Sequence, residues 1–131
     1  MRPAAAVWFE RVALAGVTLD VLHLSLLFER RIAVDGVPLA VAFTVLIPLL
    51  TAALVLFVTR RGSRTARWLF AGLVALAVVA AFNIGTEAWS RDVAVAVGVA
   101  ALALQLGSLN LLFAPSVTRW MRICREGSRP A

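Results

Sequence analysis

Long runs of apolar residues, separated by short groups of charged ones, dominate the pattern of this chain. A helix needs about 20 mostly apolar residues to cross the hydrocarbon core of a bilayer. Residues 37–58 and 93–114 contain no charged side chain, and residues 67–85 form a third apolar run that begins at Arg67. The pattern predicts a membrane-spanning helix in each of these three segments.

A fourth span is expected at residues 8–28, although its sequence is less apolar. A cleaved signal peptide is the alternative, because a basic residue precedes an apolar core. An acidic residue and a histidine inside that core, with no small-residue cleavage site after them, favour a helix that is retained. The polar side chains within the run are Thr18, Asp20, His23 and Ser25.

The arginines fall unevenly on the two sides that four spans define. All 13 basic residues are arginines. Three of them lie in the two loops of one side. Arg30 and Arg31 belong to the first loop, residues 29–36, and Arg91 belongs to the second. The other ten lie in the N-terminal segment, the loop 59–67 and the C-terminal segment. Because basic loops remain in the cytoplasm, both termini are expected on the cytoplasmic side of the membrane.

Turn and capping residues mark the expected ends of these helices. Gly36 precedes Pro38, and a proline fits the first turn of a helix because no N–H is needed there. Ser63 or Thr65 is expected to cap the third span, since both side chains can accept a hydrogen bond from the first turn.

Residues 116–126, which follow Pro115, are predicted to form a short amphipathic helix with Ser116 as its cap. Its apolar face is expected to lie on the cytoplasmic surface of the membrane, where arginines attract anionic lipid. The predicted fold is therefore a single all-α membrane domain over residues 1–131, a polytopic four-helix bundle with a C-terminal amphipathic interfacial helix. The apolar face consists of Val117, Trp120, Met121 and Cys124.

Composition supports the lipid bilayer as a partner and argues against other classes of protein. Charged residues make up 15% of the chain, against about a quarter in an ordinary soluble domain. The net charge of +6 comes from arginines beside apolar runs, which orient spans rather than bind nucleic acid. The chain has one cysteine, Cys124, and one histidine, His23, so a single chain provides no disulfide framework and no multi-cysteine metal cluster. We expect no metal and no cofactor.

Asp20 and His23 form an ionisable pair inside the first predicted span. Three residues apart on a helix, they share a face with Gly16, which lies one turn earlier. Ionisable groups are costly at this depth and usually face the interior of a bundle or a water-filled cavity. The pair is expected either to hold helices together through hydrogen bonds or to relay protons or bind a cation.

A stripe of small and polar residues follows the last predicted span at spacings of four, three, four and three. Such a face lets helices approach closely and form hydrogen bonds. This span runs antiparallel to the first, which places Gln105 at the depth of Asp20, so the two helices are expected to pack along their stripes. The stripe consists of Ala94, Gly98, Ala101, Gln105 and Ser108.

Pro48 lies in the middle of the second predicted span and is expected to kink it. Proline has no N–H, so the carbonyl of Thr44, four residues earlier, loses its helical partner. The hydroxyls of Thr44 and Thr51 are expected to help satisfy the backbone there. Prolines are common in membrane helices, so the kink is interpreted as structural, with a conduction path as the alternative.

Three segments resemble a group of small uncharacterised four-helix proteins of bacterial inner membranes. WFERVALAG at 8–16 is similar to their amino-terminal opening, and RRGSRTARW at 60–68 to their inter-helix loop. LLFAPSVTRWMR at 111–122 resembles their C-terminal end. The resemblance implies four spans with cytoplasmic ends in a bacterial inner membrane, and it implies no activity.

Three functions are compatible with these patterns. Short loops, small-residue helix faces and the lack of a catalytic motif favour a structural or accessory subunit, or a homo-oligomer, without enzymatic activity. A permeation protein for protons, cations or small solutes, using Asp20 and His23 near the membrane midplane, is the alternative. A cofactor-binding redox subunit with His23 as ligand is the second alternative, disfavoured because each chain has one histidine.

Overall fold

The computed structural model describes residues 2–83 and 93–127, and the regular secondary structure in these two ranges is entirely helical. The all-α prediction is therefore confirmed for this part of the chain. Its helices are α1 (Ala4–Leu26), α2 (Phe28–Asp35), α3 (Val37–Arg61), α4 (Arg64–Asn83), α5 (Val93–Leu112) and α6 (Pro115–Gly127).

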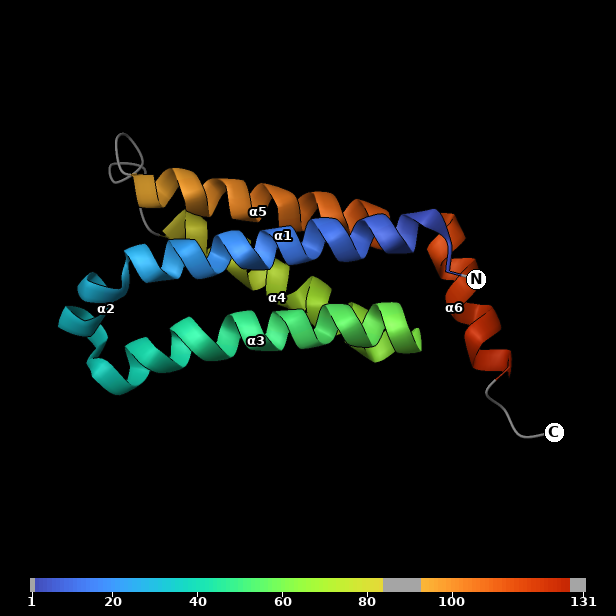
Figure 1. The fold of residues 1–131 in the computed structure, drawn as a ribbon, viewed down its shortest axis with the longest axis horizontal. Helices are drawn as coiled ribbons and strands as arrows, with labels where there is room; N and C mark the ends of the chain where they lie inside the picture. The colour runs from blue at the N-terminus through green and yellow to red at the C-terminus, as the bar shows by residue number, and fades with distance from the viewer. Residues whose placement is uncertain (1, 84–92, 128–131) are drawn as a thin grey trace.

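The four long helices lie side by side, with α2 at one end of the molecule and α6 at the other (Figure 1). Helix α1 makes its most extensive contact with α5 and its next with α3, and α4 contacts both α3 and α5. The N-terminus lies at the same end as α6 (Figure 1). Helices α1 and α5 therefore run antiparallel, as the order of spans predicts.

Three helices, α3, α4 and α5, are long and apolar enough to cross a membrane individually. Helices α1 and α2 pass the same test only together, and they are bent by 61° at the break between them. Leu27 occupies this break and still donates its N–H to the carbonyl of His23 at 3.2 Å. The described residues thus contain three candidate spans, or up to four if the bent pair counts as one.

The prediction of a loop at residues 29–36 is wrong for all but the last residue, because residues 28–35 form α2. Glu29 lies in the first turn of this helix, where an acidic side chain interacts favourably with the helix dipole. Gly36 ends α2 with a φ of 80°, a conformation that glycine adopts without strain. Pro38 follows in the first turn of α3, as predicted.

The helix ends confirm one predicted cap and correct another. Ser63 caps α4, because its Oγ accepts a hydrogen bond of 3.2 Å from the N–H of Ala66. The cap predicted at Ser116 is wrong, because α6 begins at Pro115 and Ser116 lies within its first turn. Helix α5 ends at Leu112, two residues before the predicted end of its span. Residues 84–85 of the third predicted span lie outside the described residues.

An apolar core fills the space between the long helices near α6. Phe9 and Phe70 are fully buried and meet edge to face, with their ring centroids 5.5 Å apart. Helix α6 covers this core with Val117 and Met121, which are 1% and 4% exposed. The apolar face of α6 therefore packs on the protein, and the expectation that this face lies in lipid is corrected for these two side chains.

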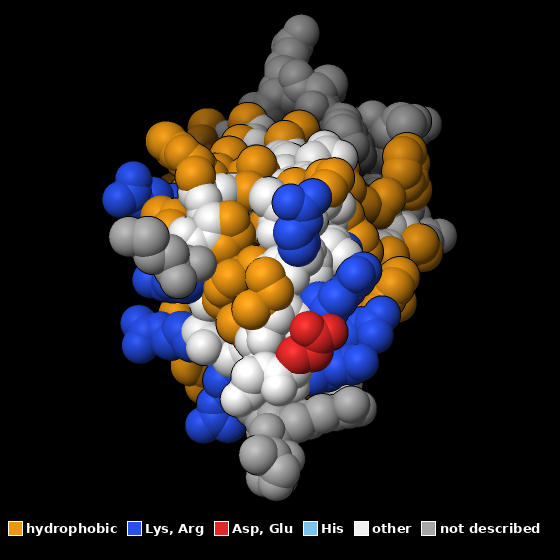
Figure 2. Space-filling view, turned by 90° about the vertical axis from the view of Figure 1, so that its right-hand side faces the viewer, with side chains coloured by type: hydrophobic (Ala, Val, Ile, Leu, Met, Phe, Trp, Pro, Cys, Tyr) orange, Lys and Arg blue, Asp and Glu red, His pale blue; other side chains and the backbone are white. Residues whose placement is uncertain are grey.

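Arginine side chains surround the end of the molecule that carries α6 (Figure 2). They come from the turn between α3 and α4 and from α6 itself. This end therefore gathers, in space, the basic segments that the sequence assigns to the cytoplasmic side. Its exposed arginines include Arg60, Arg61, Arg64, Arg119, Arg122 and Arg125.

Arg67 differs from these arginines because it is buried between α4 and α6. Its guanidinium carbon lies 4.0 Å from the centre of the Phe113 ring, a cation–π contact. Its Nη1 donates to Oγ1 of Thr118 at 3.2 Å and approaches Sδ of Met121 at 3.9 Å. The sequence groups Arg67 with the loop arginines, whereas in the structure it attaches α6 to α4.

Helix α3 continues through Pro48 without interruption. The hydroxyl of Thr44 donates to the carbonyl of Ala40 at 2.7 Å, and that of Thr51 donates to the carbonyl of Ile47 at 2.8 Å. Each hydroxyl has one hydrogen, so neither satisfies the carbonyl of Thr44 that proline leaves without a partner. That expectation is wrong, and the kink itself stays a prediction.

Candidate functional site

Helices α1 and α5 approach each other closely along the two predicted stripes. A Cβ added to Gly98 would lie 2.7 Å from Cε1 of His23, closer than real Cβ atoms come to a neighbour. A Cβ added to Gly16 would lie 3.2 Å from Cγ of Gln105. Glycine at these positions therefore permits the close approach of the helices. The other stripe residues are at most 4% exposed: Ala94, Ala101 and Ser108.

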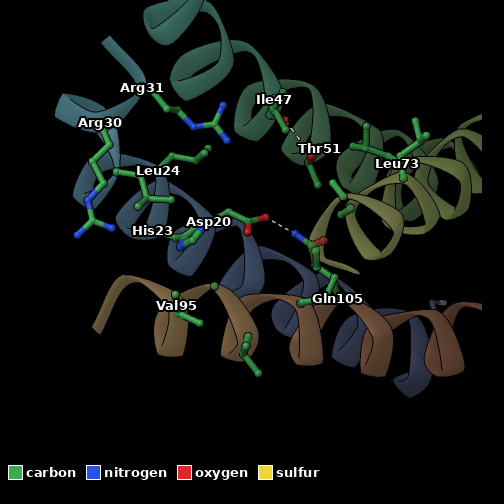
Figure 3. A pocket seen from close by; sticks show the side chains of 18 residues that line it. Asp20, His23, Leu24, Arg30, Arg31, Ile47, Thr51, Leu73, Val95 and Gln105 are labelled. Atoms are coloured by element: carbon green, nitrogen blue, oxygen red, sulfur yellow. Dashed lines mark hydrogen bonds between the residues drawn. The ribbon is translucent and has the colours of Figure 1, made fainter. Parts of the chain in front are cut away.

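Asp20 and Gln105, expected at the same depth, form a direct hydrogen bond. The amide Nε2 of Gln105 donates to the carboxylate Oδ2 of Asp20, and the two side chains point toward one another from α5 and α1 (Figure 3). Gln105 is 5% exposed. A hydrogen bond between an amide and a carboxylate is stronger where water is excluded, so this pair joins the two helices near their middle.

His23 forms a second link between the same helices. Its Nδ1 lies 2.6 Å from the carbonyl oxygen of Ala94. Because a carbonyl oxygen can only accept, Nδ1 is the nitrogen that carries the hydrogen in this bond. Asp20 and His23 therefore lie on one face of α1, as predicted, and each is bonded to α5 rather than to the other.

A cavity of about 490 Å³ lies between the four long helices and extends to α2. Its volume is within the range of small-molecule pockets, about 300–1,000 Å³. The side chains of Asp20, His23 and Gln105 form a polar area on the walls contributed by α1 and α5. The rest of the lining is mainly apolar and comes from all four long helices, including Leu24, Ile47, Leu73, Leu76, Val95 and Leu102.

Three further polar residues, Arg30, Arg31 and Thr51, line this cavity and are not among the predicted site residues. Thr51 is 2% exposed and already donates its hydroxyl to the backbone of its own helix. Arg31 reaches the cavity from α2 (Figure 3), and its guanidinium carbon lies 5.6 Å from the centre of the Phe43 ring. The sequence pattern places Arg31 in a loop. Its direction toward the cavity could have been predicted only if residues 28–35 had been recognised as a helix.

Packed side chains fill the space between the same helices on the side toward α6. The fully buried rings of Phe9 and Phe70 lie there beside Val55, Val58 and Val74, each at most 1% exposed. The cavity is therefore bounded on this side by the apolar core.

Within residues 2–83 and 93–127, no group of three or more His, Cys, Asp or Glu side chains is placed to hold a metal ion. Comparison with protein-family models, curated proteins and solved structures finds no match to this chain. The resemblance to small bacterial membrane proteins therefore stays a prediction. The function of the cavity has to be inferred from its own lining.

Proposed function

We propose that this chain is a multi-pass protein of the bacterial cytoplasmic membrane that acts by binding rather than by catalysis. It would work as an accessory subunit or homo-oligomer, with a ligand cavity inside a four-helix bundle. The observation that carries the proposal is the cavity between α1, α3, α4 and α5, with the bonded pair Asp20 and Gln105 on its wall. Protein interiors leave few unfilled spaces, and the volume of this cavity falls in the range of small-molecule sites.

The outer surface of the long helices supports insertion into a membrane. Leu46 and Leu49 of α3 are 60% and 63% exposed, and Leu69 and Leu76 of α4 are 58% and 68% exposed. Soluble monomers rarely expose extended apolar surfaces of this kind, whereas lipid accommodates them. Helix α1 is included as the fourth span, because its contact with α5 places its polar residues against that helix.

The arginines support a cytoplasmic location for the α6 end. The N-terminus, the turn at Gly62 and α6 lie together at this end, and they carry most of the basic residues of the chain. Cytoplasmic segments of membrane proteins have this excess of basic residues. Helix α2 would then lie at the opposite face of the membrane.

Asp20 on the cavity wall also supports a second candidate function, the permeation of protons or cations. Conduction would require the packed core around Phe9 and Phe70 to separate, whereas binding requires no such movement. Binding is therefore the preferred proposal. Proton or cation flux in proteoliposomes that is lost in Asp20→Asn protein would favour permeation instead.

Two alanines of α4 provide a matched test of the binding proposal. Ala77 lines the cavity, whereas Ala75 is exposed on the same helix. A phenylalanine at 77 is expected to fill part of the cavity and displace its occupant. We expect a small molecule to co-purify with wild-type and Ala75→Phe protein from native membranes, and to be absent from Ala77→Phe protein, as measured by mass spectrometry of extracts.

Circular dichroism serves as the control for folding, and the spectra of all three proteins should agree. Retention of the same molecule by Ala77→Phe protein, or the absence of any bound molecule from the wild type, would contradict the proposal.

A further inference from the structure

The charges on the cavity are arranged so that a cation faces it at one end. Within residues 2–83 and 93–127, no carboxylate forms an ion pair with Arg31. Arg2, by contrast, is paired with Glu10. Arg30 and Arg31 of α2 both belong to the cavity lining. The side chain of Arg31 points into the cavity, whereas that of Arg30 points away from it (Figure 3). The carboxylate of Asp20 lies deeper between the helices and is already bonded to Gln105. An anion entering the cavity would therefore be held at Arg31 rather than farther inside.

A second, apolar hollow adjoins the cavity on the outer surface of α3 and α4. This hollow, of about 430 Å³, shares Leu73 and Leu76 with the cavity. A Cβ added to Gly72 on this hollow would meet nothing within 4 Å. The two hollows therefore adjoin along α4, and in the proposed membrane the outer one faces the lipid chains. Its remaining lining consists of Leu50, Leu54, Trp68 and Leu69.

We infer that the cavity binds a membrane amphiphile whose anionic headgroup, a carboxylate or a phosphate, lies at Arg31 and whose single alkyl chain lies along Leu73 and Leu76. This inference rests on the proposed binding function and adds the class of ligand. A guanidinium binds both kinds of anion through paired hydrogen bonds. An alkyl chain matches the mainly apolar lining, and the adjoining hollow between α3 and α4 brings the cavity close to the proposed lipid surface.

The same arrangement discriminates against an amphiphile with a cationic headgroup. Such a headgroup would be repelled by Arg31 at the α2 end. The carboxylate of Asp20 lies deeper between the helices, away from the α2 end where the headgroup would lie, so its attraction offsets this repulsion less. Headgroup charge, and not chain length alone, should therefore decide affinity.

The test compares three amphiphiles with the same alkyl chain: hexadecanoate, hexadecyl phosphate and hexadecyltrimethylammonium. Binding of each, in radiolabelled form, to the full-length protein is measured in phosphatidylcholine nanodiscs, with empty nanodiscs as the blank. We expect at least one anion to bind about tenfold more tightly than the cation, a difference of about 1.4 kcal/mol. The tighter of the two anions identifies the headgroup as carboxylate or phosphate.

Variants separate the role of Arg31 from that of the cavity. Arg31→Gln is expected to remove the preference for anions, and Arg31→Lys, which keeps the charge, to retain it. Arg122→Gln, at the α6 end, is the charge-matched control and should bind like the wild type. Ala77→Phe should abolish the binding of all three amphiphiles.

Equal affinity for anions and cation, or an anion preference that survives in Arg31→Gln protein, would overturn the inference. If Ala77→Phe abolishes binding in the same experiment, the proposed binding function still stands and only the ligand class is wrong. Binding that is unaffected by Ala77→Phe would contradict both.

Discussion

Gly98→Ala is expected to destabilise the protein by about 1–3 kcal/mol, the usual cost of inserting a methyl group into a filled interface. The added Cβ would lie 2.7 Å from Cε1 and 2.8 Å from Nδ1 of His23. The imidazole could move away only by giving up its bond to the carbonyl of Ala94, which adds about 1 kcal/mol. The gain in helix propensity from alanine, about 1 kcal/mol, offsets part of this.

Gly107 on the same helix is the matched control, because a Cβ there would meet nothing within 4 Å. Gly107→Ala should therefore be neutral or stabilising by up to about 1 kcal/mol. Both variants are compared by unfolding in mixed micelles titrated with dodecyl sulfate and followed by circular dichroism. Equal effects of the two substitutions would show that α1 and α5 do not meet closely at Gly98.

Phe9→Ala is expected to cost about 3 kcal/mol, near the lower end of the range for truncating a buried aromatic ring. Phe9 is fully buried and meets the ring of Phe70 edge to face. Alanine would leave a cavity in the core that α6 covers, and the contact with Phe70 would be lost. The cost falls near the lower end because lipid is itself apolar, so that packing rather than transfer from water provides the stability.

Phe82 is the matched control for this substitution, because it is 81% exposed on α4. Phe82→Ala should change the same unfolding midpoint little. The measurement also reports on α6: loss of the core should increase proteolysis of the C-terminal helix in Phe9→Ala protein. A Phe9→Ala protein as stable as Phe82→Ala protein would mean that this end of the molecule is not packed as described.

The contact between α1 and α5 could be predicted because it depends on residue spacing within each helix. Small residues four and three positions apart define one face of α5, and antiparallel order alone brings Gln105 to the depth of Asp20. Nothing else in the chain was needed to predict this pairing. The hydrogen bond between the two side chains follows from that register.

The cavity could not be predicted in the same way, because its volume depends on how far four helices stand apart. Ala77, Ala80 and Ala81 of α4 contribute small side chains to its wall. The spacing of these alanines could have indicated which face of α4 lines a cavity. The helix is apolar on every face, however, so its sequence shows no face that is preferred for the interior. Arg31 was missed for a different reason: a cluster of charges after an apolar run predicts a loop, whereas here it forms α2.

The burial of Arg67 could not be predicted from the sequence either, because basic residues beside an apolar run are normally exposed. Its environment is created by α6, which folds back over the first turn of α4 and brings Thr118 and Met121 to the guanidinium. The amphipathic pattern of α6 was correctly recognised. What the pattern leaves undetermined is whether the apolar face meets lipid or protein.

In the proposed arrangement, α1 crosses the membrane and so places Asp20 and the cavity inside the bilayer. Cysteine labelling from one side tests it, with the native thiol removed by Cys124→Ser. Ala4 at the start of α1 and Val34 of α2 are both exposed, Val34 to 82%, so each position can carry a reporter cysteine. Ile123→Cys, at a position 60% exposed on α6, reports the cytoplasmic side.

An impermeant maleimide added to intact spheroplasts is predicted to label Val34→Cys protein and to leave Ala4→Cys and Ile123→Cys protein unlabelled until the membrane is permeabilised. If Ala4→Cys and Val34→Cys are instead labelled from the same side, α1 does not cross the membrane, and the intramembrane cavity proposed here does not exist.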